Sequence, residues 1–125
     1  MFTEKEIAYM KSKRLARIGT VSDESQPDVS SVRFRFDGKY FRIIGRNNPT
    51  RKYKNVAQGN TQVAMVIDDL ASVDPWTPRG IRVYGTAEIT EDGSLRIQPT
   101  ISWSWNLEGP AMVNGKFITN KTIHK

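Results

Sequence analysis

The sequence predicts a mainly β protein, an antiparallel barrel of short strands with two short helices. Apolar residues alternate with a period of two along several short runs, which is the pattern of strands with one buried face. Asp-Gly pairs and other turn formers separate these runs. No repeat or linker interrupts the 125 residues, so we expect a single domain over residues 1–125. Six or so strands joined by tight turns favour a barrel.

A short helix is expected first. Thr3 is placed to cap it, and Glu6 follows three residues later, as a capping box requires. Phe2 and Ile7 are spaced for a hydrophobic staple across that cap.

The strands follow. In residues 14–21, Ala16 and Ile18 share one face, and in residues 29–36 Val32, Phe34 and Phe36 alternate with arginines. Asp37-Gly38 predicts a hairpin to the next strand. Gly85 is expected at a bulge or a close backbone approach. The remaining strands are expected at residues 40–45, 62–67, 81–89, 95–98 and 116–119.

Two further segments complete the chain. A second helix is expected between Pro49 and Gly59. Residues 68–80, with two prolines, are predicted to form a loop. Its carboxylates, Asp68, Asp69 and Asp74, are candidate Mg²⁺ or Ca²⁺ ligands, although their spacing favours ordinary solvated side chains.

Composition excludes several kinds of chemistry. The chain has no cysteine and one histidine, His124, so a catalytic Ser-His-Asp or Cys-His set and a His/Cys zinc site are excluded. If the protein is an enzyme, the reactive group is then expected to come from a cofactor. The N-terminal residues mix charge into every turn, so we expect no signal peptide or membrane span and a cytoplasmic location.

The formal net charge of +6 favours an anionic partner: nucleic acid, a phosphorylated cofactor or an acidic substrate. Residues 46–54 combine a polar loop, a candidate cap at Thr50 and the cations Arg51 and Lys52. Cations oppose the dipole at a helix start, and a bound anion would relieve that conflict. The segment therefore fits either a phosphate pocket or a basic surface helix.

Arginines and aromatic residues also alternate before this segment. They present either a platform for a planar ring or nucleobases, or a half-exposed strand with its polar face in water. The tryptophans fit a core, a dimer interface or ring stacking. The residues concerned are Arg33, Arg35, Arg42, Phe34, Phe36, Tyr40 and Phe41, with Trp76, Trp103 and Trp105.

Four segments carry a resemblance to a known family. In order, PDVSSVRFRFDG, a strand ending near Gly45, TRKYKNVAQGNTQVAMVID and RGIRVYGTAEI resemble the pyridoxamine-phosphate-oxidase-like family of FMN-binding split β-barrels, over about residues 3–90. DDLASVDPWTPRGIRVYGTAE, with ISW at residues 101–103, is most similar to the branch that uses the deazaflavin coenzyme F-420.

The resemblance implies a homodimer with the cofactor at the subunit interface. Thr50, Arg51 and Lys52 match the family's phosphate-binding positions. Val32, Arg33 and Phe34 match the strand whose backbone runs along the cofactor ring. Arg46 and Asn47 match positions near the ribityl chain and the ring. Arg79, Gly80 and Trp103 match positions that approach the ring from the partner subunit.

The resemblance implies an oxidoreductase that binds F-420 and transfers hydride to a small organic substrate. The alternatives are an FMN-dependent reductase or flavin-binding protein, and a basic barrel that binds nucleic acid. Arg79-Gly80 replaces the Arg-Gln of the flavin-using pyridoxamine oxidases, and their C-terminal Trp and Arg-Leu motif is absent. Pyridoxamine phosphate oxidation is therefore not expected, and no catalytic residue is assigned.

Overall fold

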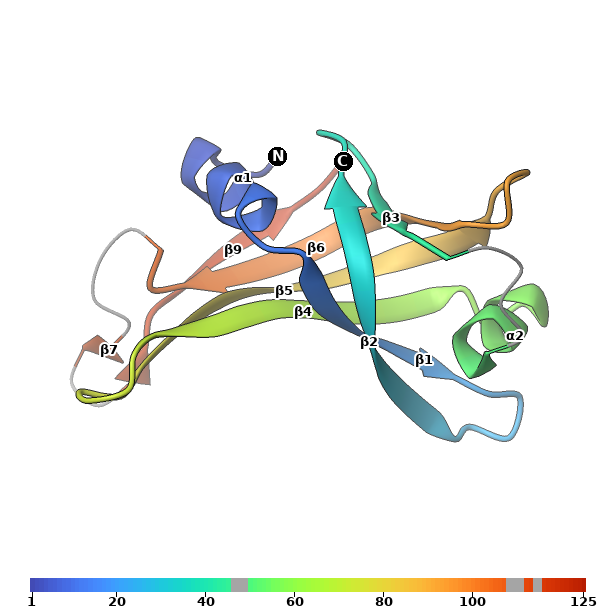
Figure 1. Cartoon of the computed structure of the whole chain (residues 1–125), viewed down its shortest axis with the longest axis horizontal. Helices are drawn as coiled ribbons and strands as arrows, with labels where there is room; N and C mark the ends of the chain where they lie inside the picture. The colour runs from blue at the N-terminus through green and yellow to red at the C-terminus, as the bar shows by residue number, and fades with distance from the viewer. Residues whose placement is uncertain (46–49, 108–111, 114–115) are drawn as a thin grey trace.

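The computed structural model describes residues 1–45, 50–107, 112–113 and 116–125 and has the predicted architecture (Figure 1). Seven antiparallel strands form one sheet in the order β3-β2-β1-β4-β5-β6-β9, and pairing of β3 with β6 closes six of them into a barrel. The elements are α1 (Glu4–Lys11), β1 (Leu15–Val21), β2 (Pro27–Phe36), β3 (Phe41–Ile43), α2 (Arg51–Ala57), β4 (Gln62–Ser72), β5 (Thr77–Ile89), β6 (Leu95–Trp105), β7 (Met112–Val113), β8 (Lys116–Phe117) and β9 (Thr119–Ile123).

The barrel is closed by strand β6, which has different neighbours along its length. Its first residues pair with β3, from Leu95 opposite Ile43 to Ile97 opposite Phe41. Its last residues pair with β9 instead. Both halves pair with β5 on the other side. The sheet is therefore closed into a barrel at one end of β6, and β9 is added beside β6 at the other end.

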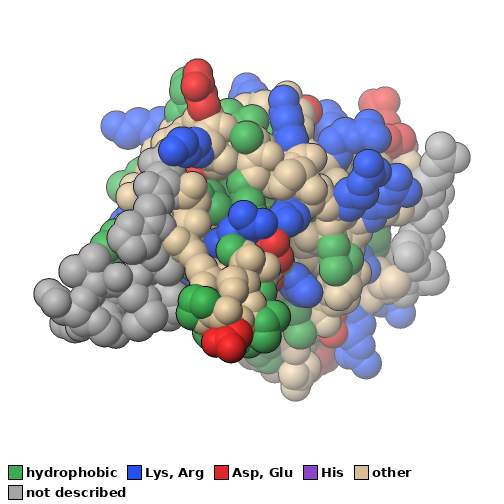
Figure 2. Space-filling view, turned by 60° about the vertical axis from the view of Figure 1, so that its left-hand side comes forward, with side chains coloured by type: hydrophobic (Ala, Val, Ile, Leu, Met, Phe, Trp, Pro, Cys, Tyr) green, Lys and Arg blue, Asp and Glu red, His purple; other side chains and the backbone are tan. Residues whose placement is uncertain are grey.

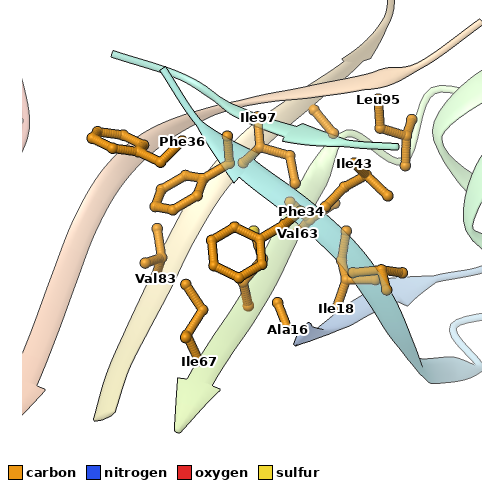
Figure 3. Packing of buried hydrophobic residues seen from close by; sticks show 14 of the residues in the cluster. Ala16, Ile18, Phe34, Phe36, Ile43, Val63, Ile67, Val83, Leu95 and Ile97 are labelled. Atoms are coloured by element: carbon orange, nitrogen blue, oxygen red, sulfur yellow. The ribbon is translucent and has the colours of Figure 1, made fainter. Parts of the chain in front are cut away.

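Alternate residues of the strands point into the barrel and form its core (Figure 3). Ala16 and Ile18 of β1 are buried, as are Val32, Phe34 and Phe36 of β2, which confirms the predicted faces. Burial of each large apolar side chain contributes roughly 1.5–3 kcal/mol.

The predicted helix start and turns are confirmed. The side chain of Thr3 accepts a hydrogen bond from the backbone of Glu6, and Glu6 accepts one from the backbone of Thr3. Gly38 in the β2–β3 hairpin and Gly59 after α2 have positive φ, of 102° and 103°. The β5–β6 register shifts at Tyr84/Gly85, where a Cβ on Gly85 would lie 2.6 Å from the Gln98 carbonyl oxygen.

The predicted loop at residues 68–80 is wrong. Strands β4 and β5 remain paired as far as Ser72 opposite Thr77, so that only residues 73–76 connect them. The carboxylates and prolines of this segment are typical of loops, but Asp69 lies opposite Arg79 and forms an ion pair with it. Cross-strand pairing between opposite charges favours strands here despite the local composition.

Other strand limits also differ from the prediction. Strand β3 is shorter than predicted, β6 continues to Trp105, and the single strand expected at residues 116–119 is divided between β8 and β9. Within the described part of the chain, no helix has the length and apolar character needed to cross a membrane.

Candidate cofactor site

An open groove of about 650 Å³ is lined by residues of α2 and of the β1–β2 hairpin. These two elements lie at one end of the barrel (Figure 1). The predicted residues Thr50, Arg51 and Lys52 line it together. Ser30 of β2 lines the opposite wall. Two carboxylates, Glu24 and Asp28, and the cation Lys54 also border the groove.

Three contacts hold α2 in place beside this groove. The Asn55 side chain donates a buried hydrogen bond of 2.9 Å to Oγ1 of Thr20 on β1. The Tyr53 hydroxyl donates one of 3.0 Å to the carbonyl oxygen of Gly45, which follows β3. Val56 is buried in the core. The first turn of the helix is thereby fixed relative to β2.

Lys52 is buried, with 9% of its surface exposed, although it carries an ammonium group. Its Nζ donates to Oγ1 of Thr50 at 3.2 Å and lies 5.8 Å from the centre of the Tyr53 ring. No Asp or Glu oxygen of the described residues lies within 4 Å of it. A buried charge without a counterion is costly, unless a ligand supplies one.

Two hydroxyl groups of the groove are also available. The Ser30 Oγ is buried and has no hydrogen-bond partner among the described residues. Thr50 occupies the N-cap position of α2, but its side chain makes no capping bond, in contrast to Thr3. Because Thr50 Oγ1 accepts from Lys52, its hydroxyl proton is left for another acceptor. These donors, with the Arg51 guanidinium, fit a phosphate group.

Within the described residues, the β3-side edge of β2 is paired over only part of its length. Pairing with β3 extends no further back than Phe34 opposite Ile43, while β2 itself begins at Pro27. The Ile44 N–H donates to the Arg33 carbonyl at 3.1 Å, but the Arg33 N–H has no backbone acceptor among the described residues. Among the described residues, the Arg33 N–H on this edge is therefore left for a planar ligand.

The side chains of β2 and β3 do not form the aromatic platform considered from the sequence. Phe34, Phe36 and Phe41 are buried in the core, with 5%, 6% and 0% of their surfaces exposed, while Arg33 and Arg35 are exposed. That interpretation is wrong, because the alternation of the strands separates the rings from the arginines.

On the face in Figure 2, Lys and Arg side chains are spread out among acidic ones and form no single stripe.

The predicted residues Val32, Arg33 and Phe34 of β2 do not line the groove beside α2. Nor do the predicted Arg79, Gly80 and Trp103, which lie on β5 and β6. Arg79 makes a two-point ion pair with Asp69, with N–O distances of 2.8 and 2.9 Å. A Cβ on Gly80 would lie 2.7 Å from the Ile67 carbonyl oxygen. Trp103 stacks against Arg82, with 4.3 Å from the guanidinium carbon to the ring centre. The predicted Arg46 and Asn47 lie outside the described residues.

Asp69 is the centre of a charged cluster that joins α1 to β4 and β5. Besides Arg79, it accepts hydrogen bonds from the Tyr9 hydroxyl at 2.7 Å and from Lys13 Nζ at 2.9 Å. The Arg79 guanidinium holds the pKa of Asp69 well below its usual range. Burial, with the bond to Asp69, raises the pKa of Tyr9. This cluster explains Arg79 as a structural residue of the single chain.

The aspartates predicted as candidate metal ligands do not come together. Asp68 and Asp69 point to opposite faces of β4, and Asp68 pairs with Arg17 at 2.7 Å. In the described ranges, no three His, Cys, Asp or Glu residues are grouped to hold a metal ion.

Sequence reasoning missed Ser30 and Arg82. Ser30 was detectable, because a period of two places it on the same face as Val32. The partnership of Arg82 with Trp103 depends on the register of β5 against β6, which no local pattern reveals.

Comparisons with known proteins identify the family and support the fold. The family model described as pyridoxamine 5'-phosphate oxidase matches residues 2–102. The 5a,11a-dehydrotetracycline/5a,11a-dehydrooxytetracycline reductase of Streptomyces rimosus is 33% identical over 122 residues, which cover 86% of this chain and 85% of that protein. Two solved structures share the fold. An F-420 reductase is 19% identical, with a TM-score of 0.64 and coverage of 81% of this chain and 98% of its own. The FAD-binding protein from Mycobacterium smegmatis is 18% identical, with a TM-score of 0.65 and coverage of 82% and 92%.

Proposed function

This chain belongs to the pyridoxamine 5'-phosphate oxidase family, and we propose that it is an F-420-dependent oxidoreductase that transfers hydride to a conjugated small organic substrate. The relatives support a flavin-type oxidoreductase or binding protein. The observation that carries the proposal further is that the hydroxyl groups of Ser30 and Thr50 and the ammonium group of Lys52 meet in one groove, where no carboxylate of the described residues pairs with Lys52.

The residues of the groove divide the work of binding. Thr50, Arg51 and Lys52 hold the coenzyme phosphate, and Ser30 donates to it from the opposite wall. The backbone edge of β2 at Arg33 aligns the ring. The bound reduced coenzyme supplies the hydride, and the protein supplies orientation and exclusion of water. We assign no proton donor to a side chain.

A homodimer completes this proposal. One lateral row of residues crosses the outer face of six strands, and its members are apolar or lack a side chain: Val29, Gly19, Ala64, Tyr84, Ile101 and Ile123. Val29, Tyr84 and Ile123 are 70%, 44% and 62% exposed. Exposed apolar surface that continues across a whole sheet is typical of a protein interface.

Sedimentation equilibrium should give twice the chain mass for the wild type, and Val29→Glu/Tyr84→Glu should give the monomer mass. A wild-type monomer at micromolar concentration contradicts this part.

Pyridoxamine phosphate oxidation is not part of the proposal. The flavin-using members have a glutamine where this chain has Gly80, and the close approach of Ile67 leaves no space there for a side chain. A cytoplasmic location stays a prediction.

FMN is the alternative cofactor, because the donors beside Thr50 suit its phosphate equally well and an FAD-binding protein shares the fold. Titration of the purified protein with F-420 and FMN, followed by tryptophan fluorescence, separates the two. We expect micromolar or tighter binding of F-420 and binding of FMN that is at least tenfold weaker. Preferential binding of FMN contradicts the F-420 assignment and makes the flavin the cofactor.

A further inference from the structure

A second cavity, of about 350 Å³, lies on the outer face of β5, β6 and β9. Two indole rings, from Trp103 and Trp105, line it with Pro78, Arg82 and Thr119. It is mostly apolar. The element bounds place it toward the start of β5, and Figure 1 shows that α2 lies at the other end of the barrel.

The two tryptophans are spaced to take a flat ring. They lie two residues apart on the same face of β6, so their Cα atoms are about 6.6 Å apart along the strand. An aromatic ring in contact with another on each side needs about 7 Å. Trp105 reaches over Gly80, where a Cβ would lie 2.9 Å from its ring, and Trp103 leans on Arg82. Both indoles are thereby held by β5, with the cavity beside them.

Charge at this cavity has one sign. Arg82 is exposed, and no carboxylate of the described residues lies within 4 Å of its guanidinium. In the same lateral row, the exposed Lys121 of β9 lies opposite Trp103. None of the lining residues is acidic. A guanidinium stacked on an indole keeps its edge N–H groups for a planar acceptor such as a carboxylate or enolate.

We propose that this cavity is the substrate subsite, and that it binds a planar, conjugated organic anion between its two indoles with the acidic group on Arg82. This subsite extends the proposed function. The transfer of hydride to the bound substrate rests on that function, whereas the binding of the substrate does not. Because the cavity and the groove beside α2 lie at opposite ends of one chain, the substrate meets the coenzyme bound by the partner subunit.

The binding step is tested without any coenzyme. The probe is 1-hydroxy-2-naphthoate, and its matched control is the neutral 1-hydroxy-2-naphthamide of nearly the same shape. Calorimetry should give at least tenfold tighter binding of the naphthoate. In Arg82→Gln the naphthoate should bind at least tenfold more weakly and the naphthamide within threefold of the wild type. Arg35→Gln, which removes an exposed arginine on β2, should change neither.

The location is tested by NMR of the three tryptophan indole N–H groups, assigned by single Trp→Phe substitutions. The naphthoate should shift the signals of Trp103 and Trp105 and leave that of Trp76 unchanged, since Trp76 lies in the β4–β5 connection and is 69% exposed. Equal affinity for the two probes, shifts at Trp76 alone, or no binding at millimolar probe each overturns the inference. If F-420 binds and the naphthoate does not, this inference alone fails. If the naphthoate binds and F-420 does not, the proposed coenzyme is wrong and the subsite stands.

Discussion

Lys52→Met is expected to stabilise the protein in the absence of ligand. Methionine retains most of the buried stem of Lys52 and removes the ammonium group. In the wild type, that group has one hydrogen bond to the described residues, at 3.2 Å to Thr50, and a distant contact with the Tyr53 ring at 5.8 Å. The hydrogen bond and the ring contact together stabilise the folded protein by roughly 2 kcal/mol. Burial of an ion costs several kcal/mol, so the net gain on substitution is about 1 kcal/mol.

This gain corresponds to a rise in Tm of roughly 4 °C for a chain of this size. Urea denaturation at pH 7 in a buffer without phosphate measures it. Lys54→Met is the matched control, because Lys54 lies in the same helix but is exposed, and its free energy of unfolding should change by less than about 0.5 kcal/mol. A loss of 1 kcal/mol or more in Lys52→Met would refute the reasoning and make Lys52 a structural residue.

Two further substitutions test the fold around β4 and β5. Asp69→Asn should lower the free energy of unfolding by about 2 kcal/mol at pH 7, because Arg79 loses its carboxylate partner. The control is Asp68→Asn, which removes one exposed ion pair and should lower the free energy of unfolding by less than about 0.5 kcal/mol. Since the folded-state pKa of Asp69 is depressed, its contribution is fully present above about pH 4 and is lost progressively as the pH falls from there toward the lower folded-state pKa. Denaturation at pH 7 and pH 3 should therefore show a smaller difference between wild type and Asp69→Asn at the lower pH, and a constant difference contradicts this. Gly80→Ala should cost about 2 kcal/mol in the same assay, because its Cβ would meet the Ile67 carbonyl oxygen at 2.7 Å, and an unchanged midpoint would mean that the backbone yields there.

Local pattern in the sequence predicts much of the barrel. The alternation around Ile18 and Phe34 determines which faces are buried, because the side chains of a strand point alternately to its two sides. The capping pair of Thr3 and Glu6 determines where α1 begins. Each of these features depends on residues close together in the chain.

The features that sequence reasoning missed depend on residues far apart in the chain or in the register. Asp69 joins Tyr9, 60 residues before it, to Arg79, and this cluster explains why residues predicted as a loop are paired strands. At Thr50 to Lys52, where cations occur at a helix start, the sequence fitted either a basic surface helix or a phosphate groove. Its opposite wall, at Ser30, required the packing of α2 against the β1–β2 hairpin.

The central claim is that the groove beside α2 binds the coenzyme phosphate, and one measurement tests it most directly. It is the dissociation constant of F-420 for the wild type and for Lys52→Met at the same ionic strength, with Lys11→Met as a control for net charge. We predict binding at least tenfold weaker in Lys52→Met and unchanged in Lys11→Met, since Lys11 is exposed on α1. Equal affinity of wild type and Lys52→Met would contradict the claim and place the phosphate elsewhere.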